Sequence, residues 1–118
     1  MRHRQAKITL DRTASQRRSL QRNLAVSLIT HGRIMTTDAK AKATRAFVER
    51  LVTIGKQGNL SGRRQLLSKL NNPAAVEKLL TTISPRFKDR PGGYLRCLKV
   101  GLRPGDGARR VRLEFIAT

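Results

Sequence analysis

Cysteine, histidine and aromatic residues are scarce in this chain of 118 residues, and each scarcity excludes a class of site. The one cysteine, Cys97, has no partner for an intramolecular disulfide, and two histidines are too few for a Cys/His zinc cluster. Aromatic residues make up 3% of the chain, whereas proteins that bind single-stranded bases by stacking use several rings. We therefore expect no disulfide framework, no metal site and no base-stacking surface.

Catalytic groups are equally scarce. The seven acidic residues are scattered, and the pair that could form a dyad, Asp38 and Glu49, has basic neighbours at helical spacing. Cys97 is far in sequence from His3 and His31, so a Cys–His nucleophile is not indicated. No glycine-rich loop of the nucleotide-binding type occurs. The sequence predicts a protein that is not an enzyme and uses no cofactor, metal or small-molecule substrate.

Long apolar segments are also missing. No stretch approaches the length of a membrane span, and residues 1–7 lack the apolar centre of a secretory signal peptide. A single cysteine fits a reducing compartment. We therefore expect a cytoplasmic protein with no membrane partner.

Positive charge is what the chain has in excess. Eighteen arginines and eight lysines stand against seven acidic residues, which gives a formal net charge of +19 at pH 7. Such a chain repels itself unless a polyanion lies against it. Its apolar stripes are too narrow for a membrane-surface helix, and arginine binds phosphate through two parallel hydrogen bonds. Nucleic acid is thus the favoured partner. Because the charge is spread over every predicted element, folded RNA is favoured over a single DNA groove.

The first part of the chain predicts an arm followed by a helix. Residues 2–12 are basic and poor in apolar side chains, which is typical of an extended arm that becomes ordered on a partner. A helix then begins at Thr13 or Ser15 and ends at Gly32. Its apolar residues recur every fourth position, at Leu20, Leu24 and Leu28. We expect the arginines on the opposite face to contact the partner; they are Arg18 and Arg22.

A short strand at 33–37 precedes a second helix, capped by Thr36 or Thr37 and ended by Gly55 and Gly58. Two ion pairs at i,i+4 spacing support this helix, Asp38 with Lys42 and Arg45 with Glu49. Its apolar stripe is Ala43, Phe47, Leu51 and Ile54. We expect this stripe to pack against the alternating apolar residues of the last strand, Val111, Leu113 and Phe115.

Two shorter helices and a hairpin complete the pattern. A third helix starts at Ser61, and a fourth starts at Asn72-Pro73 and ends at Ser84-Pro85. The imperfect alternation of residues 94–102 suggests a strand with a bulge. A loop at 104–107 joins it to a final strand. The turn at 90–93 has two interpretations, which stay open: plain turn geometry, or glycines that let a phosphate approach the backbone.

This order predicts an α+β fold, α-β-α-α-α-β-β, with a small mixed three-stranded sheet packed on helices. We expect a single domain over residues 1–118. Residues 1–12 form the arm, 13–93 are mainly helical, and 94–118 form a β-hairpin.

Short motifs along the whole chain occur in an order and spacing that resemble one known family. They are Met1-Arg2-His3-Arg4, Leu10-Asp11-Arg12, residues 31–37, Lys40-Ala41-Lys42 with Arg45, Phe47 and Val48, Pro85-Arg86-Phe87, residues 90–96, and Gly105-Asp106. Together they resemble the bacterial-type large-subunit ribosomal protein 17 family. The chain departs from the family pattern at residues 5–9 and in the third and fourth helices.

The resemblance implies the same element order and a structural role in the large ribosomal subunit. It also implies binding of folded rRNA near the nascent-chain exit and contact with large-subunit ribosomal protein 32. The residues expected to bind rRNA are basic side chains, one histidine and two turn glycines: Arg2, His3, Arg4, Lys7, Arg12, Arg17, Arg18, Arg22, Lys40, Lys42, Arg45, Arg90, Gly92, Gly93, Arg96 and Arg103.

A histone-like protein that compacts DNA without sequence preference is the alternative function. It would also be small, arginine-rich and poor in aromatics, and it would bind duplex DNA alone and dimerise through its helices. A secreted cationic membrane-active protein is disfavoured by the missing signal peptide and disulfides.

Overall fold

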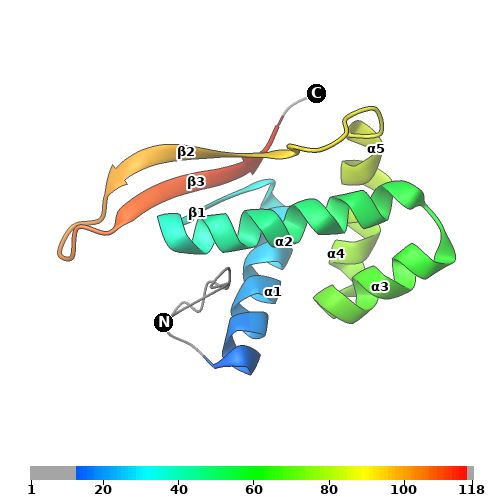
Figure 1. The fold of residues 1–118 in the computed structure, drawn as a ribbon, viewed down its shortest axis with the longest axis horizontal. Helices are drawn as coiled ribbons and strands as arrows, with labels where there is room; N and C mark the ends of the chain where they lie inside the picture. The colour runs from blue at the N-terminus through cyan, green and yellow to red at the C-terminus, as the bar shows by residue number, and fades with distance from the viewer. Residues whose placement is uncertain (1–12, 117–118) are drawn as a thin grey trace, which may run out of the picture.

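A long central helix, α2, lies between a three-stranded sheet on one side and the other main helices on the opposite side (Figure 1). The computed structural model describes residues 13–116. The predicted arm, with Arg2, His3, Arg4, Lys7 and Arg12, lies outside the described residues.

The elements in order are α1 (Ala14–His31), β1 (Arg33–Thr37), α2 (Asp38–Gln57), α3 (Leu60–Leu70), α4 (Pro73–Lys78), the π-helical turn η1 (Leu79–Ile83), α5 (Ser84–Arg86), β2 (Leu95–Leu102) and β3 (Arg109–Phe115).

This architecture confirms the α+β class and the predicted element order, with α4, η1 and α5 forming the predicted fourth helix. The sheet order is β1-β3-β2, and both pairings are antiparallel. The prediction of a mixed sheet was wrong because β3 lies between β1 and β2. Those two strands run in the same direction but are not neighbours, so no parallel pair forms. The predicted bulge in β2 is present between Lys99 and Gly101.

Helix α1 begins and ends as its sequence predicts, but its buried face differs. Thr13 forms a capping box with Gln16 at the start, and Gly32 ends the helix in the left-handed conformation with φ 81°. The buried residues are Ala25, Leu28 and Ile29, whereas Leu20 and Leu24 are only half-buried. The predicted stripe was therefore turned, because only the C-terminal half of α1 reaches the core.

Helix α2 supplies the centre of the core. Val48, Leu51 and Val52 are fully buried in one cluster with residues of the sheet. Phe47 is half-buried and lies at the margin of that cluster, where it lines a hollow between α1 and α3. The expectation that Phe47 packs on the sheet was wrong, because the buried face of α2 is centred one residue further along.

Gly55 does not end α2 but allows a close contact inside it. The helix continues to Gln57 and ends at Gly58, which has φ 66°. A Cβ atom on Gly55 would lie 2.4 Å from Oγ of Ser84, far inside ordinary contact distance. The absence of a side chain at Gly55 therefore lets the segment around Ser84 pack directly against α2.

Asparagine side chains set the ends of α3 and α4. Asn59, rather than the predicted Ser61, caps α3, because its Oδ1 accepts a hydrogen bond from the Gly62 amide at 2.7 Å. Asn71 ends α3 with φ 53°. Asn72 then caps α4 with Pro73 at the first helical position, as predicted.

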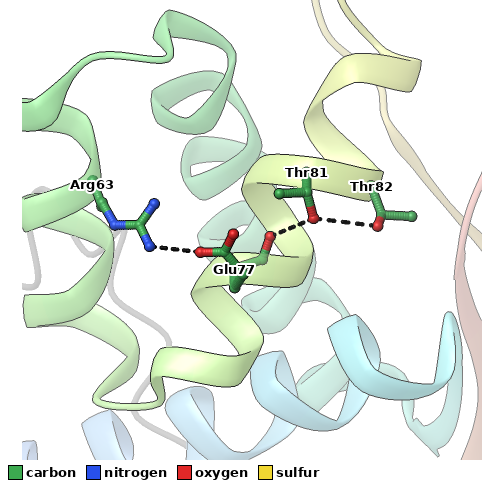
Figure 2. Close-up of polar contacts among 4 residues, drawn as sticks. All are labelled: Arg63, Glu77, Thr81 and Thr82. Carbon is green, nitrogen blue, oxygen red and sulfur yellow. Dashed lines mark hydrogen bonds and ion pairs between the residues drawn. The ribbon is translucent and has the colours of Figure 1, made fainter.

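A polar chain joins α3 to the irregular fourth helix (Figure 2). Arg63 of α3 donates a hydrogen bond to Oε2 of Glu77 at 2.6 Å, and the hydroxyl of Thr81 donates to the Glu77 carbonyl at 2.8 Å. That second bond occupies a carbonyl beside the π-helical turn, where the regular bonding pattern is interrupted. The wider turn also lets the helix continue past Pro85, which has no N–H group to donate. The helix therefore ends at Arg86 and not at the predicted Ser84-Pro85.

The Gly55–Ser84 contact generates a first prediction. Gly55→Ala should lower the free energy of unfolding by about 1–3 kcal/mol, because the added methyl group overlaps the serine hydroxyl. Ser84→Ala should be nearly neutral, because within residues 13–116 the Ser84 hydroxyl has no hydrogen-bond partner. In the double variant the loss should shrink. Urea unfolding measures all three; equal losses in the single Gly55 variant and the double variant would contradict the contact.

The corrected packing of α2 generates a second prediction. Leu51→Ala should cost about 2–5 kcal/mol of unfolding free energy, because it empties a fully buried site. Phe47→Ala should cost less than Leu51→Ala despite removing a larger side chain, because Phe47 already borders solvent. The same unfolding measurement compares them, and a larger loss for Phe47 would place that ring in the core.

Candidate nucleic-acid interface

Cationic side chains outnumber carboxylates throughout the described part of the chain. Residues 13–116 contain 22 lysines and arginines and six aspartates and glutamates. Five of those carboxylates form six ion pairs, because Glu114 pairs with two arginines, and most of the positive charge is left uncompensated. The side chains of many remaining cations make no hydrogen bond or ion pair within this range, including those of Arg18, Arg33, Arg50, Arg64, Lys88, Lys99, Arg109 and Arg110.

The two arginines predicted to lie opposite the core on α1 have a different position. Because the buried face is Ala25, Leu28 and Ile29, Arg18 and Arg22 lie on the N-terminal continuation of that face. They line a hollow of about 200 Å³ with Phe47 and Lys69. Nε of Arg22 donates to the Lys69 carbonyl at 3.2 Å and so joins α1 to the end of α3. The predicted opposite-face placement was wrong.

Arg17 is half-buried on α1, while Arg18 is exposed. Lys40 is half-buried near the start of α2. Further along α2, the predicted pairs are present, with 3.5 Å between Lys42 and Asp38 and 3.5 Å between Arg45 and Glu49. RNA binding by these α1 and α2 residues stays a prediction.

The turn at 90–93 is fixed to α2 by buried aromatic packing and by one lysine. Tyr94 is 1% exposed, and its ring centre lies 5.2 Å from that of Phe87. Nζ of Lys56 donates to the Tyr94 hydroxyl at 3.0 Å and to the Arg90 carbonyl. Burial alone would raise the pKa of Tyr94, but the hydrogen bonds from Lys56 and Thr53 outweigh it, so the pKa is lowered.

This attachment presents Arg90, Gly92 and Gly93 at the surface. Nε of Arg90 donates to the Gly92 carbonyl at 3.3 Å. Gly93 has φ 63°, a conformation that favours glycine, which supports the turn-geometry interpretation. Apart from the glycine itself and its chain neighbours, no described atom lies within 4 Å of the position a Cβ would take on either glycine, so the backbone is open to approach. Both interpretations of the two glycines therefore remain, and phosphate binding here stays a prediction.

One face of the sheet carries a group of arginines that sequence analysis identified only in part. The main helices cover the opposite face (Figure 1). Side chains that alternate along paired strands share a face with their partners across the strands. On this face, β1 contributes Arg33, Met35 and Thr37, and the central strand β3 contributes Glu114, Arg112 and Arg110. On the other side of β3, β2 contributes Arg96 and Leu98. We call these eight residues the outer sheet face. Of its four arginines, only Arg96 was a predicted site residue. Alternation in the last strand predicted that Arg110 and Arg112 lie on the face opposite its apolar residues. The pairing of β1 with β3, which brings Arg33 to the same face, could not be predicted from the sequence.

A single carboxylate organises this face. Glu114 is 8% exposed, and its Oε1 accepts a hydrogen bond from Nε of Arg96 at 2.6 Å. Its Oε2 lies 3.3 Å from Nε of Arg112. The hydrogen bond from Arg96 is the largest cause that lowers the pKa of Glu114, and the charges of Arg112 and Arg33 add to it. Glu114 is therefore ionised at neutral pH and pairs with two guanidinium groups, one at each carboxylate oxygen.

The hairpin loop carries the remaining predicted site residue. Arg103 is exposed and paired with Asp106, with Nε 3.1 Å from Oδ1. That carboxylate also accepts the Ala108 amide at 3.1 Å. The hydrogen bond from Arg103 is the main cause of a pKa of Asp106 well below its usual range. The loop is thus closed by its own ion pair, and Arg103 carries less free charge than predicted.

Within residues 13–116, no cluster of three or more His, Cys, Asp or Glu side chains could hold a metal ion. Cys97 is half-buried and packs against the core. No described helix is both long and apolar enough to cross a membrane.

Comparison with known proteins identifies the family. The family model described as Ribosomal protein L17 matches residues 20–116. Three relatives carry the name "Large ribosomal subunit protein bL17". The protein from Orientia tsutsugamushi (strain Boryong) is 51% identical over 116 residues, which cover 98% of this chain and 80% of the relative. The one from Koribacter versatilis is 51% identical over 118 residues, 100% of this chain and 73% of the relative. The one from Allorhizobium ampelinum is 50% identical over 116 residues, which cover 98% of this chain and 82% of the relative.

These matches confirm the resemblance seen in the sequence. They also support the expected assignment as a structural protein rather than an enzyme, and the expected location in the ribosome of the cytoplasm. The chain therefore belongs to the Ribosomal protein L17 family, the structural components of the large ribosomal subunit.

Proposed function

We propose that this protein binds and stabilises folded rRNA in the large ribosomal subunit. The observation that carries the proposal is the unbalanced charge of the described surface, 22 cationic against six acidic side chains. Within residues 13–116, arginine side chains without a hydrogen bond or ion pair occur on α1 and on the sheet, so contacts in more than one direction can neutralise phosphates of more than one RNA helix. The scarcity of aromatic residues favours backbone and shape recognition over base stacking.

We also propose a position near the nascent-chain exit, beside large-subunit ribosomal protein 32. The family resemblance supports this position. Chemical cross-linking of assembled large subunits tests it: cross-links from this chain to that neighbour are expected, and cross-links only to proteins remote from the exit would contradict it.

Sedimentation is the most direct test of the proposed function. After a high-salt wash, the full chain should remain with the large subunit, because many phosphate contacts act together. The isolated chain should bind large-subunit rRNA more tightly than duplex DNA of equal length and should stay monomeric. Release into the soluble fraction, together with dimers that prefer DNA, would contradict rRNA binding and favour the DNA-compacting alternative.

The turn at 90–93 generates a separate prediction. Arg90→Gln should leave the unfolding temperature unchanged, because Arg90 is exposed and, within residues 13–116, its side chain bonds only to the adjacent turn. The variant should be incorporated into large subunits less well than the wild type when the two compete. As a contrast, Arg96→Gln is expected to lower the free energy of unfolding by about 1 kcal/mol, because Glu114 then loses its hydrogen bond from Arg96. Equal incorporation of Arg90→Gln and wild type would assign the turn a purely structural role.

A further inference from the structure

We propose that the outer sheet face binds the sugar–phosphate backbone of a double-stranded rRNA segment, and that Glu114 is the positioning residue of this site. The inference rests on the proposed function but goes beyond it, because it assigns one surface, one form of RNA and a role for a carboxylate. It is argued from the arrangement of Arg33, Arg96, Arg110 and Arg112 around Glu114.

The four arginines form an array on one face of the sheet. In the strand register, Arg33 of β1 and Arg96 of β2 both lie opposite Glu114 of the central strand β3. Their backbones are therefore about 10 Å apart across the sheet. Arg110 and Arg112 are two residues apart on β3, so they are about 7 Å apart along it. An array of this size can contact several phosphates of one backbone, and a rigid sheet holds the spacing.

The ion pairs with Glu114 leave the phosphate-binding atoms of two arginines available. Arg96 and Arg112 each approach the carboxylate through Nε. Within residues 13–116, their terminal Nη groups make no hydrogen bond. A guanidinium has five N–H donors in a fixed plane. The hydrogen bond to Glu114 can therefore fix the plane of the Arg96 guanidinium, and the ion pair holds Arg112 beside the same carboxylate, while the outer edges of both groups remain free for a phosphate.

Arg33 and Arg110 supply the uncompensated charge. Neither side chain forms a hydrogen bond or an ion pair in the described range, and Arg33 is exposed whereas Arg110 is half-buried. One carboxylate against four guanidinium groups leaves a net positive face, which complements a phosphate backbone. The same surplus would also attract an acidic peptide, so the test must separate the two.

The side chains between the arginines favour a duplex over a single strand. The outer sheet face has no aromatic ring on which an unpaired base could stack. Met35, 55% exposed, and Leu98, half-buried, lie on either side of Arg112. Such small apolar surfaces suit contact with ribose, and arginines beside them reach the phosphates of a helix recognised by shape.

The salt dependence of binding tests the surface. The probe is deproteinised bacterial large-subunit rRNA, titrated with the full chain at several salt concentrations. Arg33→Gln/Arg110→Gln should reduce the slope of log K against log salt by about one to two. The matched control, Arg50→Gln/Arg64→Gln, removes the same charge from exposed positions on α2 and α3 and should change the slope by less than half of that. Equal slope changes for the two double variants would overturn the proposal.

Glu114→Gln tests the positioning role. The substitution raises the net charge by one, so long-range attraction alone predicts tighter binding to any polyanion. Loss of positioning predicts at least threefold weaker binding to rRNA, with binding to heparin unchanged or tighter. Thermal unfolding identifies the fraction folded under assay conditions, and affinities are compared per folded molecule. Equal weakening for rRNA and heparin, or tighter binding to both, would overturn the role of Glu114.

Further outcomes separate this inference from the proposed function. If wild-type protein fails to bind rRNA, the proposed function itself fails. A second outcome concerns an acidic protein as the partner. Here the wild type binds rRNA, and Arg33→Gln/Arg110→Gln binds rRNA with the same salt slope but no longer binds a polyglutamate peptide. That result would overturn RNA binding by the outer sheet face and assign the face to an acidic protein. Competition by a single-stranded RNA that equals competition by a duplex of the same length would overturn the assignment to double-stranded RNA.

Discussion

Repulsion among cationic side chains is the constraint on which the rest of this structure depends. With 22 lysines and arginines on residues 13–116, the folded chain concentrates charge that the unfolded chain spreads out. Three of the six carboxylates in this range form ion pairs that hold separate segments or a loop together. Glu77 joins α4 to α3, Asp106 closes the hairpin loop, and Glu114 joins neighbouring strands. Acidic residues thus act as internal connections, and the surplus charge is left at the surface for a polyanion.

The core that resists this repulsion is small and centred on α2. Its buried residues contact the sheet on one side and α1, α3 and the irregular fourth helix on the other. Three of the four aromatic residues pack together at one end, where the ring centre of Phe87 lies 5.2 Å from that of Tyr94 and 6.2 Å from that of Phe115. This cluster joins the end of the helical segment to β2 and β3, so it also determines where the turn at 90–93 is presented.

Local signals allowed most of the fold to be predicted from sequence. The caps at Thr13 and Asn72, the stop at Gly32 and the alternation of the last strand were confirmed, because each depends on neighbouring residues. The errors concern features that tertiary packing decides. The buried face of α1 depends on which half of the helix reaches α2, and the antiparallel sheet depends on β3 lying between two distant strands.

The candidate site shows the same division. Family resemblance and charge indicated a nucleic-acid surface, and the exposed positions of Arg90 and Arg96 agree with it. Sequence did not reveal that Arg22 contacts the Lys69 carbonyl or that Arg103 is paired with Asp106. It also could not join Arg33 to Arg112, because 78 intervening residues separate strands that only the folded sheet brings together.

The effect of salt on the stability of the free protein tests the central claim most directly. Urea is uncharged, so urea unfolding can be measured at fixed pH over a range of sodium chloride concentrations. If repulsion is the governing constraint, the free energy of unfolding should rise as salt screens the surface charges, and the slope m should stay constant. A free energy that falls with added salt would show that the internal ion pairs outweigh the repulsion, and it would contradict the account.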